Sequence, residues 1–259
     1  MNYGLYISAT GATNAMYRQD VLGGNLANLD TVGFKPVIAS ARLRDAARVE
    51  DSLWNLPSNE MLERLGAGVH AAPNRVSFKQ GPIETTGNPF DLAIRGDGFF
   101  LVRGQGESTS EQLRLSRDGR LTQNDEGTLV RTADGLPVLD PNGREIRLPE
   151  AQRIVIQSDG RILADGEVAA RIGLIDVRDR SALTPEGHGL MRPTAEAFSN
   201  RIPATGVIDQ FAVEGSAVNE IETLMQLTSA ARAAQGNLRM ISMHDQLMDR
   251  AINRLGRIS

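Results

Sequence analysis

The two ends of the chain carry the same spacing of small and apolar residues, and this spacing is helical. Over residues 5–29 and again over residues 224–255, such residues recur at alternating steps of three and four. A repeat of this kind is the heptad pattern of helices that pack lengthwise against one another. The polar exceptions are Ser8, Gln19 and Asp245. The two stripes therefore predict terminal helices that face each other or the same helices of further copies.

The stripes supply the candidate packing residues. We expect the helices to meet through Leu5, Ala12, Leu22, Leu26 and Leu29 near the start of the chain, and through Leu224, Leu227, Leu238, Ile241, Met248, Ile252 and Leu255 near its end. A plainer interpretation stays open, because leucine and alanine at heptad spacing also occur in ordinary helical hairpins within one domain.

The first helix is predicted over residues 3–29, which contain no proline. We expect its glycines to lie away from the packing stripe; they are Gly4, Gly11, Gly23 and Gly24. Each costs about 1 kcal/mol relative to alanine, so the helix depends on a packing partner. Turn-forming residues over 28–33 and Pro36 then end it. The last helix is predicted to follow a cap at Ser216 or Asn219 and to run for about 36 residues.

Between the helices the chain is typical of an antiparallel β domain. Short apolar runs alternate with six Asp-Gly or Asn-Gly pairs, at residues 97–98, 118–119, 134–135, 142–143, 159–160 and 165–166. Such pairs favour tight hairpins because these residues tolerate positive φ. One continuous buried strand is expected over residues 168–177. The predicted fold is therefore α+β: residues 1–30 and 216–259 form a split coiled-coil domain, residues 31–75 an extended connector, and residues 76–215 an antiparallel β domain.

Composition excludes several classes of function. The 259 residues carry 28 basic and 32 acidic side chains, a net charge of −4 that gives no strong attraction to nucleic acid. There is no cysteine, so disulfides and thiolate chemistry are excluded. No apolar run approaches the roughly 18 residues of a membrane-spanning helix, and we expect no membrane span. The first residues lack the pattern of a cleaved signal peptide.

No residue pattern indicates catalysis, a metal or a cofactor. His70, His188 and His244 do not have the spacing of a metal-binding pair on one helix face. The Gly96-x-Gly98 run lacks the third glycine and the helix of a dinucleotide site. Aspartates at turns could include a pair of catalytic carboxylates, but turn formation already explains them. We expect no catalytic residue, no metal site and no cofactor.

A short run after the first helix resembles a known signature. The chain reads N-L-A-N over residues 25–28 and T-V-G-F-K over residues 31–35. This pattern resembles the N-terminal signature of the bacterial flagellar rod and hook proteins. Residues 96–102, 115–119 and 129–139 look like the central β domain of that family, and residues 215–225 look like the start of its C-terminal helix. The signature turn comprises Asn25, Asn28, Thr31, Gly33, Phe34 and Lys35.

The resemblance implies a structural subunit of the flagellar rod. It implies terminal helices that pair around a central channel, an outer β domain, and partners that are copies of this chain, other proximal and distal rod subunits and the flagellar type III export apparatus. It places the chain in the periplasmic rod of the basal body, exported without a cleaved signal peptide. The chain's length and its opening residues 3–6 look most like the proximal-rod members, with the distal-rod members as the alternative. Gly24, and the run over residues 233–236, depart from the usual family pattern.

Two other classes remain as alternatives. One is a peptidoglycan-modifying enzyme whose long helices form a dimerisation stalk, and it requires a cleft with paired carboxylates. The other is an adaptor that binds one partner through its β domain and does not polymerise. The signature turn also admits two interpretations. In one it only ends the helix, with Gly33 at positive φ; in the other it also fixes the angle of the outer domain, and Phe34 anchors against a neighbour.

Overall fold

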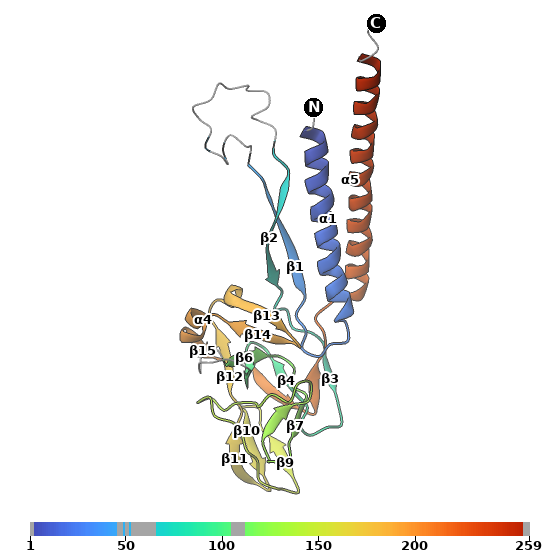
Figure 1. Cartoon of the computed structure of the whole chain (residues 1–259). Coiled ribbons are helices and arrows are strands. Elements are labelled where there is room, and N and C mark those ends of the chain that lie inside the picture. The colour runs from blue at the N-terminus through green and yellow to red at the C-terminus, as the bar shows by residue number, and fades with distance from the viewer. Residues whose placement is uncertain (1–2, 46–48, 50–51, 53–65, 105–111, 256–259) are drawn as a thin grey trace. The chain divides into compact units, whose positions relative to one another are not determined.

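The structure is a computed structural model of the whole chain, and it describes residues 3–45, 49, 52, 66–104 and 112–255. A long helix lies at each end of the chain and the middle is rich in strands, so the predicted α+β class is confirmed (Figure 1). The chain divides into two compact units. The helical unit comprises Met1–Ala27, Val37–Val76 and Asn219–Ser259, and the β-rich unit comprises Asn28–Pro36 and Ser77–Val218.

Among its described residues, the helical unit contains two long helices and one pair of strands. Helix α1 spans Tyr3–Ala27 and packs against helix α5, Glu220–Leu255, which has the predicted 36 residues. The side chain of Asn219 accepts a hydrogen bond from the Glu222 N–H at 3.0 Å, so the predicted cap is confirmed. Strands β1 (Val37–Leu43) and β2 (Val69–Val76) pair antiparallel and lie against α1 (Figure 1).

The segment 31–75 is not a free connector where the structure describes it. Residues 31–36 belong to the β-rich unit, whereas β1 and β2 hydrogen-bond to each other in the helical unit. The sequence indicated extended backbone here, but charged residues over 42–51 obscured the pairing of two strands that are far apart in the sequence. Residues 46–48, 50–51 and 53–65 lie outside the described part of the chain.

The β-rich unit is built from short antiparallel strands. The largest sheet has the order β13-β14-β6-β5-β12-β15, a second has the order β11-β10-β9, and three pairs join β16 to β4, β17 to β3 and β7 to β8. Their bounds are β3 Ile83–Thr85, β4 Leu92–Arg95, β5 Phe99–Arg103, β6 Leu113–Ser116, β7 Leu121–Gln123, β8 Leu129–Arg131, β9 Ile154–Ile156, β10 Arg161–Ala164, β11 Glu167–Arg171, β12 Leu174–Val177, β13 Leu183–Gly187, β14 Leu190–Pro193, β15 Arg201–Pro203, β16 Val207–Gln210 and β17 Ala212–Glu214. Two short helices, η1 (Arg180–Ala182) and α4 (Ala195–Ser199), complete it.

The predicted hairpin pairs are confirmed where they join neighbouring strands. Residues 159–160 connect β9 to β10, and residues 165–166 connect β10 to β11. Both residues of the second pair have positive φ, 51° at Asp165 and 96° at Gly166, as a primed turn requires. Gly119 serves a different purpose, because a Cβ there would lie 1.8 Å from the carbonyl oxygen of Leu92.

The core of the β-rich unit contains side chains from several of these sheets. Its fully or nearly buried members include Leu92, Ile94, Phe100, Leu121, Leu129, Val138, Ile146, Ile162, Ile172 and Ile208. The single strand predicted over residues 168–177 is wrong: the run is divided between β11 and β12, which belong to different sheets. The break falls at Gly173, whose N–H donates to the Leu139 carbonyl and where a Cβ would lie 2.7 Å from that oxygen. Among the helices that the structure describes, none is long and apolar enough to cross a bilayer.

Candidate functional site

The contact between α1 and α5 is close and antiparallel. A Cβ added to Gly4 would lie 2.7 Å from Nε2 of His244, and one added to Gly11 would lie 3.0 Å from Oδ1 of Asn237. Gly4 and Gly11 are seven residues apart on α1, and the residues that they approach, His244 and Asn237, are seven residues apart on α5 in the reverse order. The two helices are therefore antiparallel. Because α5 continues to Leu255, it extends past the first turn of α1 (Figure 1).

Burial along α5 follows one stripe at steps of three and four. Its members are Thr223, Leu227, Ala230, Ala234, Asn237, Ile241, His244, Met248 and Ala251, all buried or half-buried. Facing it, α1 buries Ser8, Ala12, Ala15 and Leu22. The expectation that the glycines of α1 avoid the packing stripe is wrong for Gly4 and Gly11, because the absence of their side chains lets α5 approach closely. Gly23 and Gly24 have no atom within 4 Å of an added Cβ.

The candidate packing residues fall into two groups on α5. Leu227, Ile241 and Met248 lie on the stripe that faces α1, whereas Leu224, Leu238 and Ile252 lie one position to its side and are 41%, 51% and 66% exposed. The side chain of Leu255 lies outside the described residues. In the N-terminal part, Ala12 and Leu22 are buried, and Leu5, Leu26 and Leu29 are half-buried. Leu29 follows the end of α1 and belongs to the β-rich unit.

A second set of exposed apolar side chains lies on another face of α5. Met240, Met243 and Leu247 are 46%, 56% and 58% exposed. Together with the exposed residues Leu224, Leu238 and Ile252, they leave apolar side chains on both flanks of the stripe that packs on α1. A helix that is apolar around most of its circumference is normally buried on more than one side. We call these six residues the flanks of α5.

The first asparagine of the signature turn ties α1 to β1. The side chain of Asn25 is buried; its Nδ2 donates to the Val37 carbonyl at 2.7 Å, and its Oδ1 accepts from the Val37 N–H at 2.8 Å. An amide side chain carries both an acceptor oxygen and a donor NH₂, so it satisfies the backbone N–H and the carbonyl of Val37 at once. Asn25 therefore fixes the end of α1 to the first residue of β1.

The rest of the signature turn folds into the β-rich unit. Thr31 Oγ1 donates to Asn28 Oδ1 at 3.1 Å, and the Phe34 N–H donates to the Thr31 carbonyl at 3.1 Å. Gly33 has φ +69°, and a Cβ there would lie 2.5 Å from the carbonyl carbon of Arg117. Both its conformation and this close approach require glycine. Phe34 is half-buried, and its carbonyl accepts from the Ala217 N–H at 3.1 Å.

Lys35 ends the signature turn in a buried ionic cluster. Its Nζ donates to Glu214 Oε1 at 2.7 Å and to the Lys79 carbonyl at 2.7 Å. Nη1 of Arg117 donates to Glu214 Oε2 at 3.0 Å, and the three side chains are at most 4% exposed. Burial lowers the pKa of Lys35, while the hydrogen bond and charge of Glu214 oppose that shift. Two cations thus share one carboxylate inside the β-rich unit.

Comparisons with known proteins match this arrangement along nearly the whole chain. Residues 5–35 match the family described as "Flagella basal body rod protein", residues 93–164 the "Flagellar hook protein FlgE/F/G D1 domain", and residues 209–255 the "Flagellar basal body rod FlgEFG protein C-terminal". The flagellar basal-body rod protein FlgF of Caulobacter vibrioides is 32% identical over 262 residues that cover 100% of both chains. The chain belongs to the flagellar basal-body rod protein family.

Other members of the rod family cover the chain equally fully. FlgG of Bacillus subtilis is 28% identical and covers 96% of this chain and 97% of its own length. FlgF of Rhizobium meliloti is 29% identical and covers 99% of both. The resemblance seen in the signature turn is therefore confirmed at the level of the family. Both FlgF, which the opening of the sequence favoured, and FlgG, its alternative, are among these relatives.

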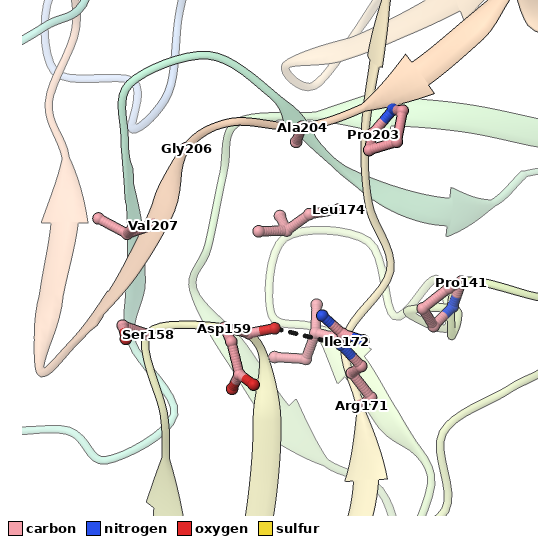
Figure 2. Close-up of a pocket in the computed structure, with 10 residues that line it drawn as sticks. All are labelled: Pro141, Ser158, Asp159, Arg171, Ile172, Leu174, Pro203, Ala204, Gly206 and Val207. Atoms are coloured by element: carbon pink, nitrogen blue, oxygen red, sulfur yellow. Dashed lines mark hydrogen bonds between the residues drawn. The ribbon is translucent and has the colours of Figure 1, made fainter.

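The rod-family relatives are structural proteins and not enzymes. One pocket of the β-rich unit lies among the residues labelled in Figure 2. It has a volume of about 430 Å³ and is lined mainly by apolar and backbone groups, with Asp159 and Arg171 as its charged side chains. Nε of Arg171 donates to the Asp159 carbonyl at 3.2 Å, as Figure 2 shows. The backbone N–H of Arg161 donates to the Asp159 carboxylate and lowers the pKa of that carboxyl. A general acid needs a raised pKa and a second carboxylate, and this lining supplies neither.

Sequence reasoning missed Glu214 and Arg117 as partners of the signature turn. Lys35 and Glu214 are 179 residues apart, and Arg117 and Glu214 are 97 residues apart. One signal was present, since Glu214 ends the apolar run of β17 and a charge at such a position needs a partner. Nothing local identifies that partner. Among the residues that the structure describes, no group of three or more His, Asp or Glu side chains is placed to hold a metal ion.

Proposed function

We propose that this rod-family chain is a structural subunit of the proximal rod of the flagellar basal body. Its terminal helices pair as a coiled coil and polymerise with copies of the chain and with other proximal and distal rod subunits, forming part of a hollow drive shaft. The chain reaches the periplasm through the flagellar type III export apparatus. In this proposal residues 1–30 and 216–259 form the rod domain, and residues 76–215 form the outer domain.

The observation that carries the proposal is the pair of apolar flanks on α5. Leu238 is 51% exposed and Leu247 is 58% exposed in the single chain, although both lie on the longest helix of a rod-family protein. Monomeric proteins rarely leave contiguous apolar surface without a partner. Helices of neighbouring subunits would cover these flanks, while the inner stripe stays against α1. The proximal assignment is supported by the FlgF relative that covers 100% of both chains.

Complementation tests the function. The gene for this chain is expressed in a bacterium that lacks its own FlgF and, separately, in one that lacks FlgG. We expect motility in soft agar to return in the first strain only, with the chain present in isolated basal bodies. Rescue of the second strain alone would move the assignment to the distal rod, and rescue of neither, with the chain stably produced, would contradict a rod function in that host.

A matched pair of substitutions tests the flanks. Leu238→Asp places a charge on a flank, whereas Gln246→Asp places the same charge at an exposed polar position on the side of α5 opposite the buried stripe. Burial of an unpaired charge at a subunit contact costs several kcal/mol, so we expect Leu238→Asp to abolish incorporation into basal bodies and Gln246→Asp to permit it. Both purified variants should melt like the wild type, because Leu238 is not buried against α1. An intact rod carrying Leu238→Asp would refute the role of this flank.

A further inference from the structure

Two segments join the β-rich unit to the helices along the chain. The incoming segment, residues 28–36, follows α1, and the outgoing segment, residues 214–218, precedes α5. Within the β-rich unit these segments hydrogen-bond to each other. The Gly33 N–H donates to the Glu214 carbonyl at 2.6 Å, and the Ala217 N–H donates to the Phe34 carbonyl at 3.1 Å. Two of the places where the chain passes between the units, after α1 and before α5, therefore lie side by side within the β-rich unit.

The carboxylate of Glu214 binds these segments to the rest of the β-rich unit. It is fully buried and accepts three hydrogen bonds, from Lys35 Nζ at 2.7 Å, the Gly81 N–H at 2.9 Å and Arg117 Nη1 at 3.0 Å. Nη2 of Arg117 in turn donates to the Gly96 carbonyl at 2.8 Å. One side chain thus connects the outgoing segment to the incoming segment, to the loop before β3 and to the end of β6.

The charges make this carboxylate hard to replace. Two cations approach it inside the protein. Lys35 also donates to the Lys79 carbonyl, and Arg117 donates to the Ile94 and Gly96 carbonyls. Removal of the one buried anion leaves two buried cations without compensating charge, which is far more costly than the loss of an exposed ion pair. The incoming and outgoing segments should then open together, because both depend on the same group.

We propose that Glu214 is a positioning residue whose carboxylate holds the incoming and outgoing segments together as one lock, so that the chain enters the β-rich unit after α1 and leaves it before α5 at adjacent points of that unit. The lock is a property of the single chain. Its consequence for polymerisation rests on the proposed function. If the incoming and outgoing segments separated, α1 and α5 of a subunit would no longer start from adjacent points of the β-rich unit.

The chain offers an internal probe of this lock. It contains two lysines only, Lys35 inside the lock and the exposed Lys79. In a limited acetylation time course, read by mass spectrometry of peptides, Lys79 should react freely and Lys35 only when the lock opens. We expect Glu214→Gln to raise the rate at Lys35 on the order of a hundredfold relative to Lys79. The amide NH₂ of the new side chain would face one of three donors and leave it unpaired.

Glu126→Gln is the matched control, because Glu126 is an exposed glutamate of the same unit. It should leave the ratio of the two lysine rates unchanged. An unchanged rate at Lys35 in Glu214→Gln, with folding confirmed by circular dichroism, would overturn the proposal.

A second variant tests the coupling of the two segments even if Glu214→Gln does not fold. Lys35→Met leaves Glu214 paired with Arg117 and with the Gly81 N–H, so the unit should remain folded. Hydrogen exchange should then accelerate in both the incoming and the outgoing segments, while β9–β11 stay protected. Acceleration confined to the incoming segment would show that Lys35 holds only its own segment, and the lock would be wrong. These outcomes do not depend on whether the wild-type chain enters a rod.

Discussion

At the residue scale, Lys35 makes the stability of the β-rich unit depend on pH. Burial is the main cause that lowers its pKa below the ordinary value of 10.5, and the nearby Arg117 and Arg180 lower it further. Between the lowered pKa and 10.5 the unfolded chain holds a proton that the folded chain has released. The free energy of unfolding therefore rises with pH across that window, by at most about 1.4 kcal/mol per pH unit for one proton.

The variant Lys35→Met removes this titration. Urea unfolding of the wild type and of Lys35→Met, measured at a series of pH values up to 10.5, should show a rise in the wild type that the variant lacks. Lys79→Met is the control, because the Lys79 side chain is exposed and only its backbone carbonyl joins the ionic cluster. Parallel pH profiles for the wild type and Lys35→Met would contradict a lowered pKa at this position.

Gly33 is subject to two constraints, a positive φ and a close backbone contact, whereas Gly135 is subject to the first alone. Gly33 and Gly135 both have φ +69°, but a Cβ at Gly135 has no atom within 4 Å, whereas one at Gly33 lies 2.5 Å from backbone at Arg117. Gly135→Ala should cost only the left-handed strain, about 1–2 kcal/mol. Gly33→Ala should cost about 1–3 kcal/mol more, because backbone must shift. Equal losses in chemical denaturation would show that the contact with Arg117 is not tight.

At the element scale, the glycines of α1 are not equivalent. Gly11 lies against Asn237 of α5, whereas Gly23 has open space around an added Cβ. In a helix glycine costs about 1 kcal/mol relative to alanine, and leucine costs much less. Gly23→Leu should therefore stabilise α1. Gly11→Leu should destabilise the helical unit by about 1–3 kcal/mol through overpacking against α5. Hydrogen exchange of α1 amides distinguishes the two, and equal protection would refute the close helix contact.

This close contact also explains which part of the helix pair could be predicted. The heptad spacing identified both helices, and the N-terminal stripe contains Ala12 and Leu22, which are buried. On α5 the predicted stripe and the buried stripe share Leu227, Ile241 and Met248. At other positions the sequence favoured Leu238 and Ile252, whereas burial falls on the residues just before them. Leu238 and Ile252 stay exposed, and only the contact geometry reveals that.

The β-rich elements show a similar division between local and distant information. Turns such as Asp165-Gly166 follow from the conformational preferences of two residues, so their hairpins were predictable. The sheet order was not, because pairings such as Met191 with Leu115 join residues far apart in the sequence. The candidate site divides in the same way. Its Gly33 and Lys35 were visible in the signature turn, whereas their partner Glu214 depends on the folded chain.

At the scale of the whole molecule, the β-rich unit is discontinuous in sequence. It comprises residues 77–218 and the separate stretch 28–36, which supplies Gly33 and Lys35. A fragment of residues 28–218 retains both parts, whereas a fragment of residues 77–218 leaves Glu214 with Arg117 and Gly81 but without Lys35. Domain boundaries drawn from strand content alone would select the second fragment and remove the ionic partner of its last strand.

The two fragments therefore should differ in stability although they contain the same strands of the β-rich unit. We expect the 28–218 fragment to unfold with the free energy of the β-rich unit in the full chain. The 77–218 fragment should lose at least one hydrogen bond between charged groups, about 1.5–3 kcal/mol. Lys35→Met in the longer fragment is the matched control and should account for the ionic part of the loss, the remainder arising from the Gly33 and Phe34 backbone bonds. Coincident unfolding curves for the two fragments would show that residues 28–36 do not contribute to the stability of the β-rich unit, and that residues 77–218 fold equally well without them.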